Sequence, residues 1–293
     1  MSSYLLQRLR FFCRKFALGF QNTDLVLDVG SGNDPHPRAD VLCDKFVSDD
    51  TERQGSLTVD RPLVGGDLEH LPFRDRAFGF AIASHVLEHV SDPERAAGEL
   101  SRVARRGYVE TPAEFGGKLM DLPGHRWYVR EEGSQLVFTG KSQAMYDDVI
   151  NHVAFTLWGQ RDDAWMRFFY AHRELFFVEH RWDESLAVRV LGEASLVTAE
   201  ASFIGADVER TLSKAVDRSP RARLKHAIRD YYRSPLYGPR RPVELSQLCV
   251  CPICRGTLRW EPQAIHCTAC QASFPQAEAD GCAVPMLLRD LAR

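Results

Sequence analysis

The chain has 293 residues, of which 44% are hydrophobic and 26% are charged, and its formal net charge is −3. These values are ordinary for a folded globular protein, and the slight negative charge excludes a global basic field of the kind that attracts nucleic acid. No run of 18 apolar residues occurs and basic residues interrupt the apolar runs of the N-terminus, so neither a transmembrane helix nor a secretory signal is expected. We therefore expect a cytoplasmic protein.

The first segment of the chain has the spacing of an amphipathic helix. Leu5, Leu9, Phe12 and Phe16 recur on one helical face, which is the pattern of a helix with one apolar side. We expect this face to pack on the protein's own domain, with binding to a membrane surface as the alternative.

Strands and helices then alternate along the chain. Short apolar runs predict strands over 25–30, 39–44 and 78–84, a helix over 93–106 and a further strand over 107–112. This alternation predicts an α/β fold with a mostly parallel sheet. Only about ten residues separate the first two strands, which is too short for an ordinary crossover helix.

The part of the chain that follows, residues 113–182, is irregular and rich in aromatic residues. We expect a hairpin over 127–140, a helix over 160–172, and late antiparallel strands in 174–182 and 185–192. The segment holds four of the five tryptophans of the chain, which are Trp127, Trp158, Trp165 and Trp182. A lid over a substrate site is one interpretation, and ordinary core is the other.

A basic stretch separates the C-terminal part from the rest. Residues 218–241 contain eight Lys or Arg and one acid, with three prolines, a composition typical of a linker or an exposed helix. We expect a first domain over 1–217, a basic linker over 218–243 and a small domain over 244–293. A solvated surface is the simple interpretation of the linker, and contact with RNA phosphates is the sharper one.

The string "DVGSGN", residues 28–33, follows the first predicted strand. Gly30 and Gly32 allow the backbone to approach a ligand closely, with Asp28 before them and Asn33 after them. Further along, Asp44 ends the second strand, where a carboxylate can accept both hydroxyls of a ribose. Asp67 and Leu68, in "GDLEHLPF", are suited to an adenine edge, and Ser84 ends the strand that precedes "HVLEHV".

These four motifs, in this order, resemble the class I S-adenosylmethionine-dependent methyltransferases over residues 24–112. The resemblance implies a Rossmann-like, doubly wound sheet and binding of S-adenosylmethionine by the residues just named. It also places His85 at the reaction centre, as the first candidate for a base. His125 is the second candidate, although a hydrogen-bonded structural histidine is the simpler interpretation of it. The shortened first crossover departs from the family pattern and leaves the methionine contacts open.

The string "HVLEHV" also matches the spacing of a zinc-protease motif with two histidines and a glutamate on one helix. That interpretation needs a further acidic ligand, and we do not expect it here. A metal site is instead expected near the C-terminus, where two C-x-x-C pairs are separated by twelve residues. This spacing predicts a structural zinc ion held by Cys251, Cys254, Cys267 and Cys270. Cys249 and Cys282 are expected to be spare.

Residues 244–293 resemble the zinc-ribbon activator subunit of tRNA, rRNA and release-factor methyltransferases. The resemblance implies that the ribbon docks on the methyltransferase domain of the same chain. The main functional hypothesis is methylation of oxygen or nitrogen on a small or medium acceptor, for example a glycan. An RNA methyltransferase that uses the fused ribbon as activator is the first alternative. A cofactor-binding module without activity is the second.

Overall fold

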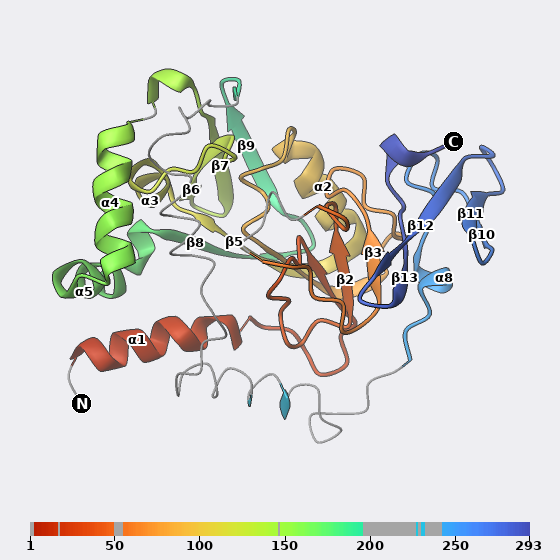
Figure 1. The fold of residues 1–293 in the computed structure, drawn as a ribbon, viewed down its shortest axis with the longest axis horizontal. Coiled ribbons are helices and arrows are strands. Elements are labelled where there is room, and N and C mark those ends of the chain that lie inside the picture. The colour runs from red at the N-terminus through yellow and green to blue at the C-terminus, as the bar shows by residue number, and fades with distance from the viewer. Residues whose placement is uncertain are drawn as a thin grey trace.

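The computed structural model describes residues 3–16, 18–49, 55–145, 147–195, 227, 230–231 and 242–293. Most of the expected basic linker, 218–243, lies outside the described residues. The centre of the molecule is a six-stranded sheet with the strand order β3-β2-β1-β4-β5-β8 (Figure 1). Its strands are β1 (Val26–Val29), β2 (Val41–Asp44), β3 (Leu63–Gly65), β4 (Phe78–Ser84), β5 (Ala104–Pro112) and β8 (Phe177–Asp183).

The expectation of a mostly parallel α/β sheet is confirmed. The first five strands pair in parallel, and β8 pairs antiparallel with β5. Strands β1 and β2 are buried along their whole length, which suits apolar runs covered on both faces. The helix predicted over 93–106 is α2 (Pro93–Val103), capped by Asp92. It ends earlier than expected because Ala104 already begins β5.

The short first crossover is also confirmed. Residues 30–40 connect β1 to β2 through turns and extended backbone, without a helix. Among the described residues, α2 is the one helix that connects two neighbouring parallel strands. The sheet therefore has less helical cover near β2 and β3 than alternating strands and helices normally provide.

A second, three-stranded sheet is formed by residues that follow β5 in the chain. It contains β6 (Trp127–Glu132), β7 (Gln135–Gly140) and β9 (Ala187–Leu191). Strands β6 and β7 form the hairpin expected over 127–140. Strand β9 was expected to be antiparallel, which is wrong, because it pairs in parallel with β7. The expected insertion also reaches too far, because its last residues form β8 of the central sheet.

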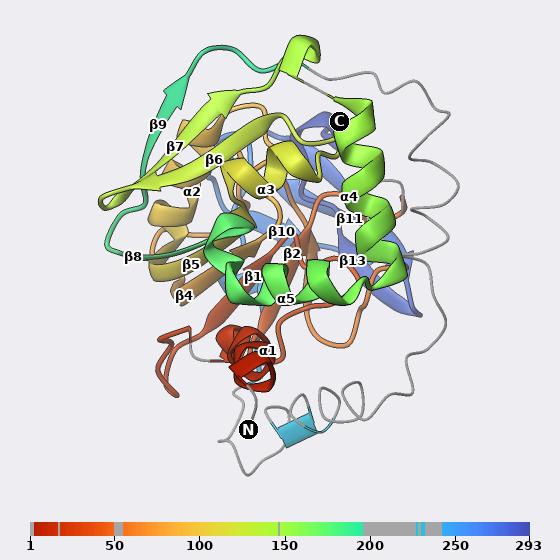
Figure 2. The same cartoon turned by 90° about the vertical axis from the view of Figure 1, so that its left-hand side faces the viewer.

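The remaining helices of the first part lie beside this smaller sheet and the N-terminus (Figure 2). They are α1 (Ser3–Cys13), α3 (Glu114–Leu119), α4 (Asp148–Gln160) and α5 (Asp163–Ala171), with short 3-10 turns at Arg14–Phe16, Gln143–Met145 and Arg173–Leu175. Helix α5 agrees with the expected helix, while α4 was not predicted. No helix among the described residues has the length and apolar character needed to cross a membrane.

Helix α1 packs on its own chain, as expected, but through a different face. Tyr4 and Phe11 contact Tyr170 of α5 edge to face, at ring-centroid distances of 5.9 and 5.3 Å. Leu5 and Leu9 remain half exposed. The aromatic rings offer a larger area to bury and a favourable edge-to-face geometry, which periodicity of Leu and Phe alone does not reveal.

The C-terminal module, residues 242–293, is built around a four-stranded antiparallel sheet. Its elements are α8 (Leu245–Leu248), β10 (Leu258–Trp260), β11 (Ala264–Cys267), β12 (Ser273–Ala279), β13 (Cys282–Pro285) and a 3-10 turn at Arg289–Leu291. The module lies against the β3 side of the central sheet (Figure 1). Leu287 donates its backbone N–H to Gly65 of β3 at 2.8 Å, and Val250 donates to Pro72 at 2.9 Å.

Side chains continue this contact into the core. Val284 and Met286 of the module share one buried cluster with Leu42 of β2 and Leu63 of β3. A Cβ atom on Gly65 would lie 2.7 Å from the sulfur of Met286, so the backbone of β3 and the module pack without intervening space. The module therefore supplies apolar cover where the sheet has no crossover helix.

Candidate active site and metal centre

A cavity of about 840 Å³ opens at the carboxyl ends of β1, β2 and β4, the edge where open α/β sheets bind their ligands. Its volume lies within the range of small-molecule and cofactor sites. All ten residues that the sequence assigned to cofactor and catalysis line this one cavity. They are Asp28, Gly30, Gly32, Asn33, Asp44, Asp67, Leu68, Ser84, His85 and His125.

The loop after β1 requires both of its glycines. Gly30 has a φ of +68° and Gly32 a φ of +52°, conformations that glycine adopts without a steric penalty. A Cβ on Gly30 would also lie 2.9 Å from the side chain of Val86. The N–H of Gly32 donates to Asp44 Oδ2 at 2.9 Å, so the loop and the carboxylate at the end of β2 are held together.

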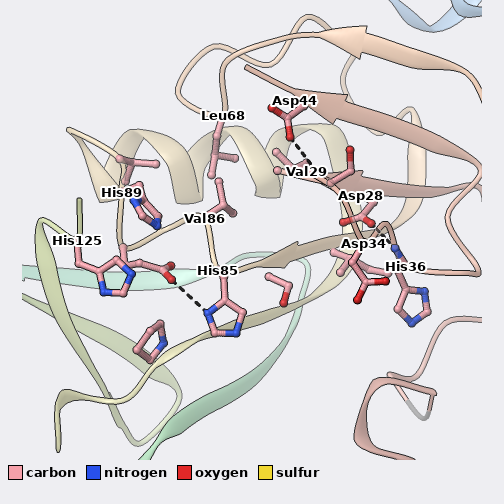
Figure 3. A pocket seen from close by; sticks show the side chains of 18 of the residues that line it. Asp28, Val29, Asp34, His36, Asp44, Leu68, His85, Val86, His89 and His125 are labelled. Carbon is pink, nitrogen blue, oxygen red and sulfur yellow. Dashed lines mark hydrogen bonds and ion pairs between the residues drawn. The ribbon is translucent and has the colours of Figure 1, made fainter. Parts of the chain in front are cut away.

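The acidic residues Asp28 and Asp44 of the first two strands lie on one side of the cavity (Figure 3), which Asp67, after β3, also lines. Asp44 is buried and also accepts the backbone N–H of Phe46 at 2.9 Å through Oδ1. Asp67 forms an ion pair with Lys45 at 2.7 Å and accepts the N–H of Glu69. These contacts fix the carboxylates in place. Carboxylate oxygens in these positions are suited to accept hydrogen bonds from the hydroxyls of a ribose and the amine of an adenine.

Asp28 is a buried carboxyl group beside the glycine loop. It accepts the backbone N–H of His36 at 2.6 Å, and the described residues form no ion pair with it. Burial raises the pKa of Asp28 to about 7, although the hydrogen bond from His36 lowers it. A buried carboxyl at the cavity wall is suited to a positively charged ligand group, and the cofactor expected here carries an ammonium and a sulfonium.

His85 follows β4 and has a φ of +56°. Its Nε2 lies 3.3 Å from Glu110 and its Nδ1 lies 3.4 Å from Glu88. Desolvation opposes the positive charge on the ring, but the neighbouring carboxylates of Glu110 and Glu88 outweigh it and raise the pKa of His85 to about 9. The ring is therefore protonated at neutral pH, which argues against the base role expected from the sequence.

Glu110 was missed by sequence reasoning. It lies in the middle of β5, is fully buried, and receives two hydrogen bonds of 2.9 Å from Arg14 and a third of 2.9 Å from Tyr108. The turn after α1 is thus tied to the wall of the cavity. A carboxylate inside a buried strand is itself a signal, because such a charge requires partners. The identity of those partners could not be read from the sequence.

The string "HVLEHV" does not form a helix. Residues 85–92 are turns and extended backbone between β4 and α2, so the zinc-protease arrangement is absent from this segment. His125 lies across from His89, with ring centroids 4.8 Å apart. Burial lowers the pKa of His125 to about 3, which leaves the ring neutral. The buried carboxylate of Glu88 lies close to both of these histidines.

Beyond these histidines the cavity becomes apolar. Its lining there comes from the residues just after α3, from α4 and α5, and from the start of β8 with the residue before it. It comprises Met120, Leu122, Phe155, Trp158, Phe169, Phe176 and Phe177. His85 contacts Phe177 edge to face, with a ring-centroid distance of 5.8 Å. The cavity therefore has an acidic end below the sheet loops and an aromatic end made by the segment after β5.

The four cysteines of the two C-x-x-C pairs gather in the C-terminal module. Cys254 Sγ lies 3.4 Å from Cys267 Sγ, and Cys251 Sγ lies 3.7 Å from Cys270 Sγ. Sulfurs bound to one zinc at about 2.3 Å lie about 3.8 Å apart in a tetrahedron, whereas a disulfide requires about 2.0 Å. A Cβ on Gly256 would press on two of these sulfurs at 3.1 Å. The set fits a zinc ion.

Residues 27–109 match the family model described as a methyltransferase domain. This stretch is similar to a methyltransferase domain. It begins inside β1, ends inside β5, and contains every residue assigned to the cofactor from the sequence. The methyltransferase domain thus supplies the acidic end of the cavity, and the aromatic end comes from residues after the matched stretch.

Two curated proteins, both demethylmenaquinone methyltransferases, are similar to part of the chain. The one from Renibacterium salmoninarum is 34% identical over 107 residues, which cover 34% of this chain and 44% of the relative. The one from Paenarthrobacter aurescens is 32% identical over 104 residues, covering 33% and 40%. The chain thus spans less than half the length of these curated relatives.

Solved structures are also similar, at low identity. The complex between the Haloferax volcanii Trm112 methyltransferase activator and its candidate methyltransferase matches with 13% identity and a TM-score of 0.35. That match covers 59% of this chain and 90% of the other. An S-adenosylmethionine-dependent methyltransferase from Mesorhizobium loti matches with 14% identity and a TM-score of 0.30, covering 45% and 64%.

Proposed function

We propose that the whole chain is an S-adenosylmethionine-dependent methyltransferase that methylates an oxygen or nitrogen of a small or medium-sized acceptor. One observation carries this proposal. The acidic end of the cavity, within the methyltransferase domain, continues without a break into an aromatic end built by the following segment. Such a two-ended cavity suits a cofactor at one end and an acceptor at the other.

The acidic end supports cofactor binding residue by residue. Gly30 and Gly32 would lie under the methionine part, Asp44 would accept the ribose hydroxyls, and Asp67 with Leu68 would contact the adenine. Asp28 would face the positive charge of the methionine part, with Asn33 beside it. Bound there, the cofactor supplies an electrophilic methyl group on a sulfonium, which becomes a neutral thioether when the methyl leaves.

The protein's contribution to this transfer is alignment. The acceptor atom must approach the methyl carbon in line with the bond to sulfur, so a cavity that holds both molecules supplies most of the effect. Ser84 and His85 lie at the junction between the two ends. Because both ring nitrogens of His85 face carboxylates, we assign it a positioning role there. A catalytic role of His125 stays a prediction.

The aromatic end favours an acceptor with a flat or apolar body. All seven of the lining side chains there are aromatic or large and apolar, including Trp158, Phe169 and Phe177. The two curated relatives act, by their names, on demethylmenaquinone, and this supports a small-molecule acceptor. The RNA alternative depended on the fused ribbon and on the basic linker, and most of that linker lies outside the described residues. It therefore stays a prediction without added support.

Calorimetry with S-adenosylhomocysteine tests the cofactor end. Asp44→Ala removes a charged acceptor for two hydroxyls and should weaken binding by about 1–3 kcal/mol. Asp163→Ala is the matched control, because this exposed carboxylate of α5 pairs only with Arg167 on the surface. Equal affinity of wild type and Asp44→Ala would remove Asp44 from the site. No binding by the wild type would favour the non-catalytic alternative.

We also propose that the C-terminal module is a zinc ribbon with a structural role. Four thiolates complete a tetrahedral zinc and leave no open position for a substrate. The packing of Met286 and Leu287 on β3 supports a role in maintaining the methyltransferase domain. This is the role that the activator resemblance implies, here within one chain.

A further inference from the structure

A second set of potential metal ligands lies inside the cavity, apart from the four cysteines. Glu88, His89 and His125 each offer one ligand atom, and these atoms all lie within 4.8 Å of one another. Glu88 and His125 are buried, and His89 is partly exposed. All three line the cavity, and Figure 3 shows His89 and His125 near each other on the side away from Asp28 and Asp44.

The carboxylate of Glu88 has an unusual environment. Only 1% of the residue is exposed, yet neither oxygen accepts a hydrogen bond from the described residues. Its one charged neighbour is His85, whose Nδ1 lies 3.4 Å from Oε1. A buried carboxylate ordinarily has hydrogen-bond donors or a cation. Oε2 is therefore free to take one further positive partner.

The histidines are oriented as metal ligands are. His89 places Nδ1 3.1 Å from the carbonyl oxygen of Gly124, which leaves Nε2 as the available ligand atom. Metal-binding histidines characteristically donate their other ring N–H to a carbonyl or carboxylate in this way. His125 has no hydrogen bond to either ring nitrogen among the described residues, and its ring stands nearly perpendicular to that of His89.

The backbone holds the two segments that supply these side chains. The N–H of Arg126 donates to the carbonyl of Glu88 at 2.8 Å, and the indole of Trp127 donates to the carbonyl of Val90 at 2.8 Å. The turn after β4 and the loop before β6 are thus fixed against each other. The three ligands therefore stand on a rigid frame rather than on free loops.

We propose that Glu88, His89 and His125 bind a divalent first-row transition-metal ion, of which Zn²⁺ is the reference case. Two histidines and one carboxylate form a ligand set typical of such ions. Bonds of about 2.0–2.2 Å join ligand atoms that lie at most about 4.2 Å apart. The present separations of up to 4.8 Å are slightly wider than that limit, so binding requires the three side chains to move closer together.

Three protein ligands leave at least one coordination position open toward the cavity. An ion with an open position binds an oxygen of a second molecule and lowers the pKa of that oxygen. On the proposed function, this oxygen belongs to the acceptor, which points to a phenol, enol or carboxylate as the acceptor class. The metal-binding part of the inference does not depend on methyl transfer.

Titration of the full chain with Co²⁺ tests the site. The protein is first loaded with one equivalent of Zn²⁺ to fill the four cysteines, and Co²⁺ binding is then followed by calorimetry and visible absorption. Wild type should bind one Co²⁺ that shows no thiolate-to-metal charge-transfer absorption. His89→Ala and Glu88→Gln should weaken this binding at least tenfold, whereas His172→Ala, an exposed histidine of similar type, should leave it unchanged.

Two outcomes overturn the proposal. One is equal Co²⁺ affinity in wild type, His89→Ala and His172→Ala; the other is binding that appears only with thiolate absorption. His89→Ala keeps the test decisive if Glu88→Gln fails to fold, because His89 is only partly buried. A chain that binds Co²⁺ here but not S-adenosylhomocysteine would retain the metal site and contradict the proposed function instead.

Discussion

Asp28 is a carboxyl group that folding removes from water without supplying a positive charge. Its pKa is raised to about 7 by burial, above the value of about 3.9 in an unfolded chain. Between these two values the native state holds a proton that the unfolded state has released. The contribution of Asp28 to the free energy of unfolding is therefore most favourable below about pH 4. It becomes less favourable as the pH rises to about 7.

We predict that Asp28→Asn weakens this pH dependence. Asparagine does not ionise, so the variant should gain stability relative to wild type between pH 5 and pH 8. The difference should not exceed about 4 kcal/mol, because each pKa unit corresponds to about 1.4 kcal/mol. Urea unfolding at the two pH values measures it. Parallel curves for the two proteins would contradict the assignment of the buried proton to Asp28.

A second residue-scale prediction concerns Lys141. Its ammonium is fully buried and lies 2.6 Å from Asp121, which also accepts a hydrogen bond from Tyr128. Lys141→Met would leave the carboxylate of Asp121 buried without its counter-charge, and such losses typically cost about 3–5 kcal/mol. Lys118→Met is the control, because the Lys118–Glu114 pair is exposed and should contribute under about 1 kcal/mol. Equal effects in denaturant unfolding would refute the distinction.

The residues in and around the cavity differ in how far the sequence could predict their positions and contacts. Asp28, Gly30, Asp44 and Asp67 follow strands whose order fixes their neighbours, so local motifs were enough to bring them into one cavity. The contacts of Glu110 could not be predicted in this way. Arg14 lies 96 positions from it, and only the path of the turn after α1 brings the two together.

Elements whose partners are not sequence neighbours were predicted less well. The apolar spacing of 185–192 indicates a strand but contains no information about direction, and β9 pairs in parallel with β7 because the chain returns to the hairpin after β8. The face of α1 was misassigned for a related reason. Its Leu spacing is regular, but the surface it meets on α5 is aromatic, and aromatic side chains of α1 fill it.

The C-terminal sheet allows a prediction at the scale of one element. Its few strands enclose little apolar volume, so the proposed zinc should supply much of its folding free energy. Cys270→Ser removes one ligand and should lower zinc content below one equivalent in this module and lower the melting temperature. Cys282→Ser is the control, since Cys282 is exposed on β13 and outside the cluster. Identical zinc content in both variants would contradict the ligand assignment.

At the scale of the whole molecule, the module and the central sheet share one hydrophobic core. Cys249, Ile265 and Phe274 belong to the same buried cluster as Val29 of β1. The apolar side chains of the first part near β3 are therefore covered by the module and would meet water without it. The C-terminal module covers β2 and β3, next to the short connection over residues 30–40 that contains no helix.

Removal of residues 244–293 should therefore damage the remaining chain. The exposed faces of Leu42 and Leu63 would meet water, so we predict a truncated protein that aggregates or melts at a lower temperature than the full chain. Size-exclusion chromatography and thermal unfolding of the two proteins measure this. A truncated chain that is monomeric and equally stable would show that the module is only appended to the methyltransferase domain.

The contact between the module and β3 also constrains how the protein is made. Arg289 contacts His70 across 219 positions of sequence, so this edge of the central sheet closes only after the C-terminal module has been synthesised. Domains generally fold as units during synthesis, and long-range pairing is slow. The nascent chain must therefore carry an unfinished sheet through most of translation. Its newly synthesised form should depend on holding chaperones until the C-terminal module has been made.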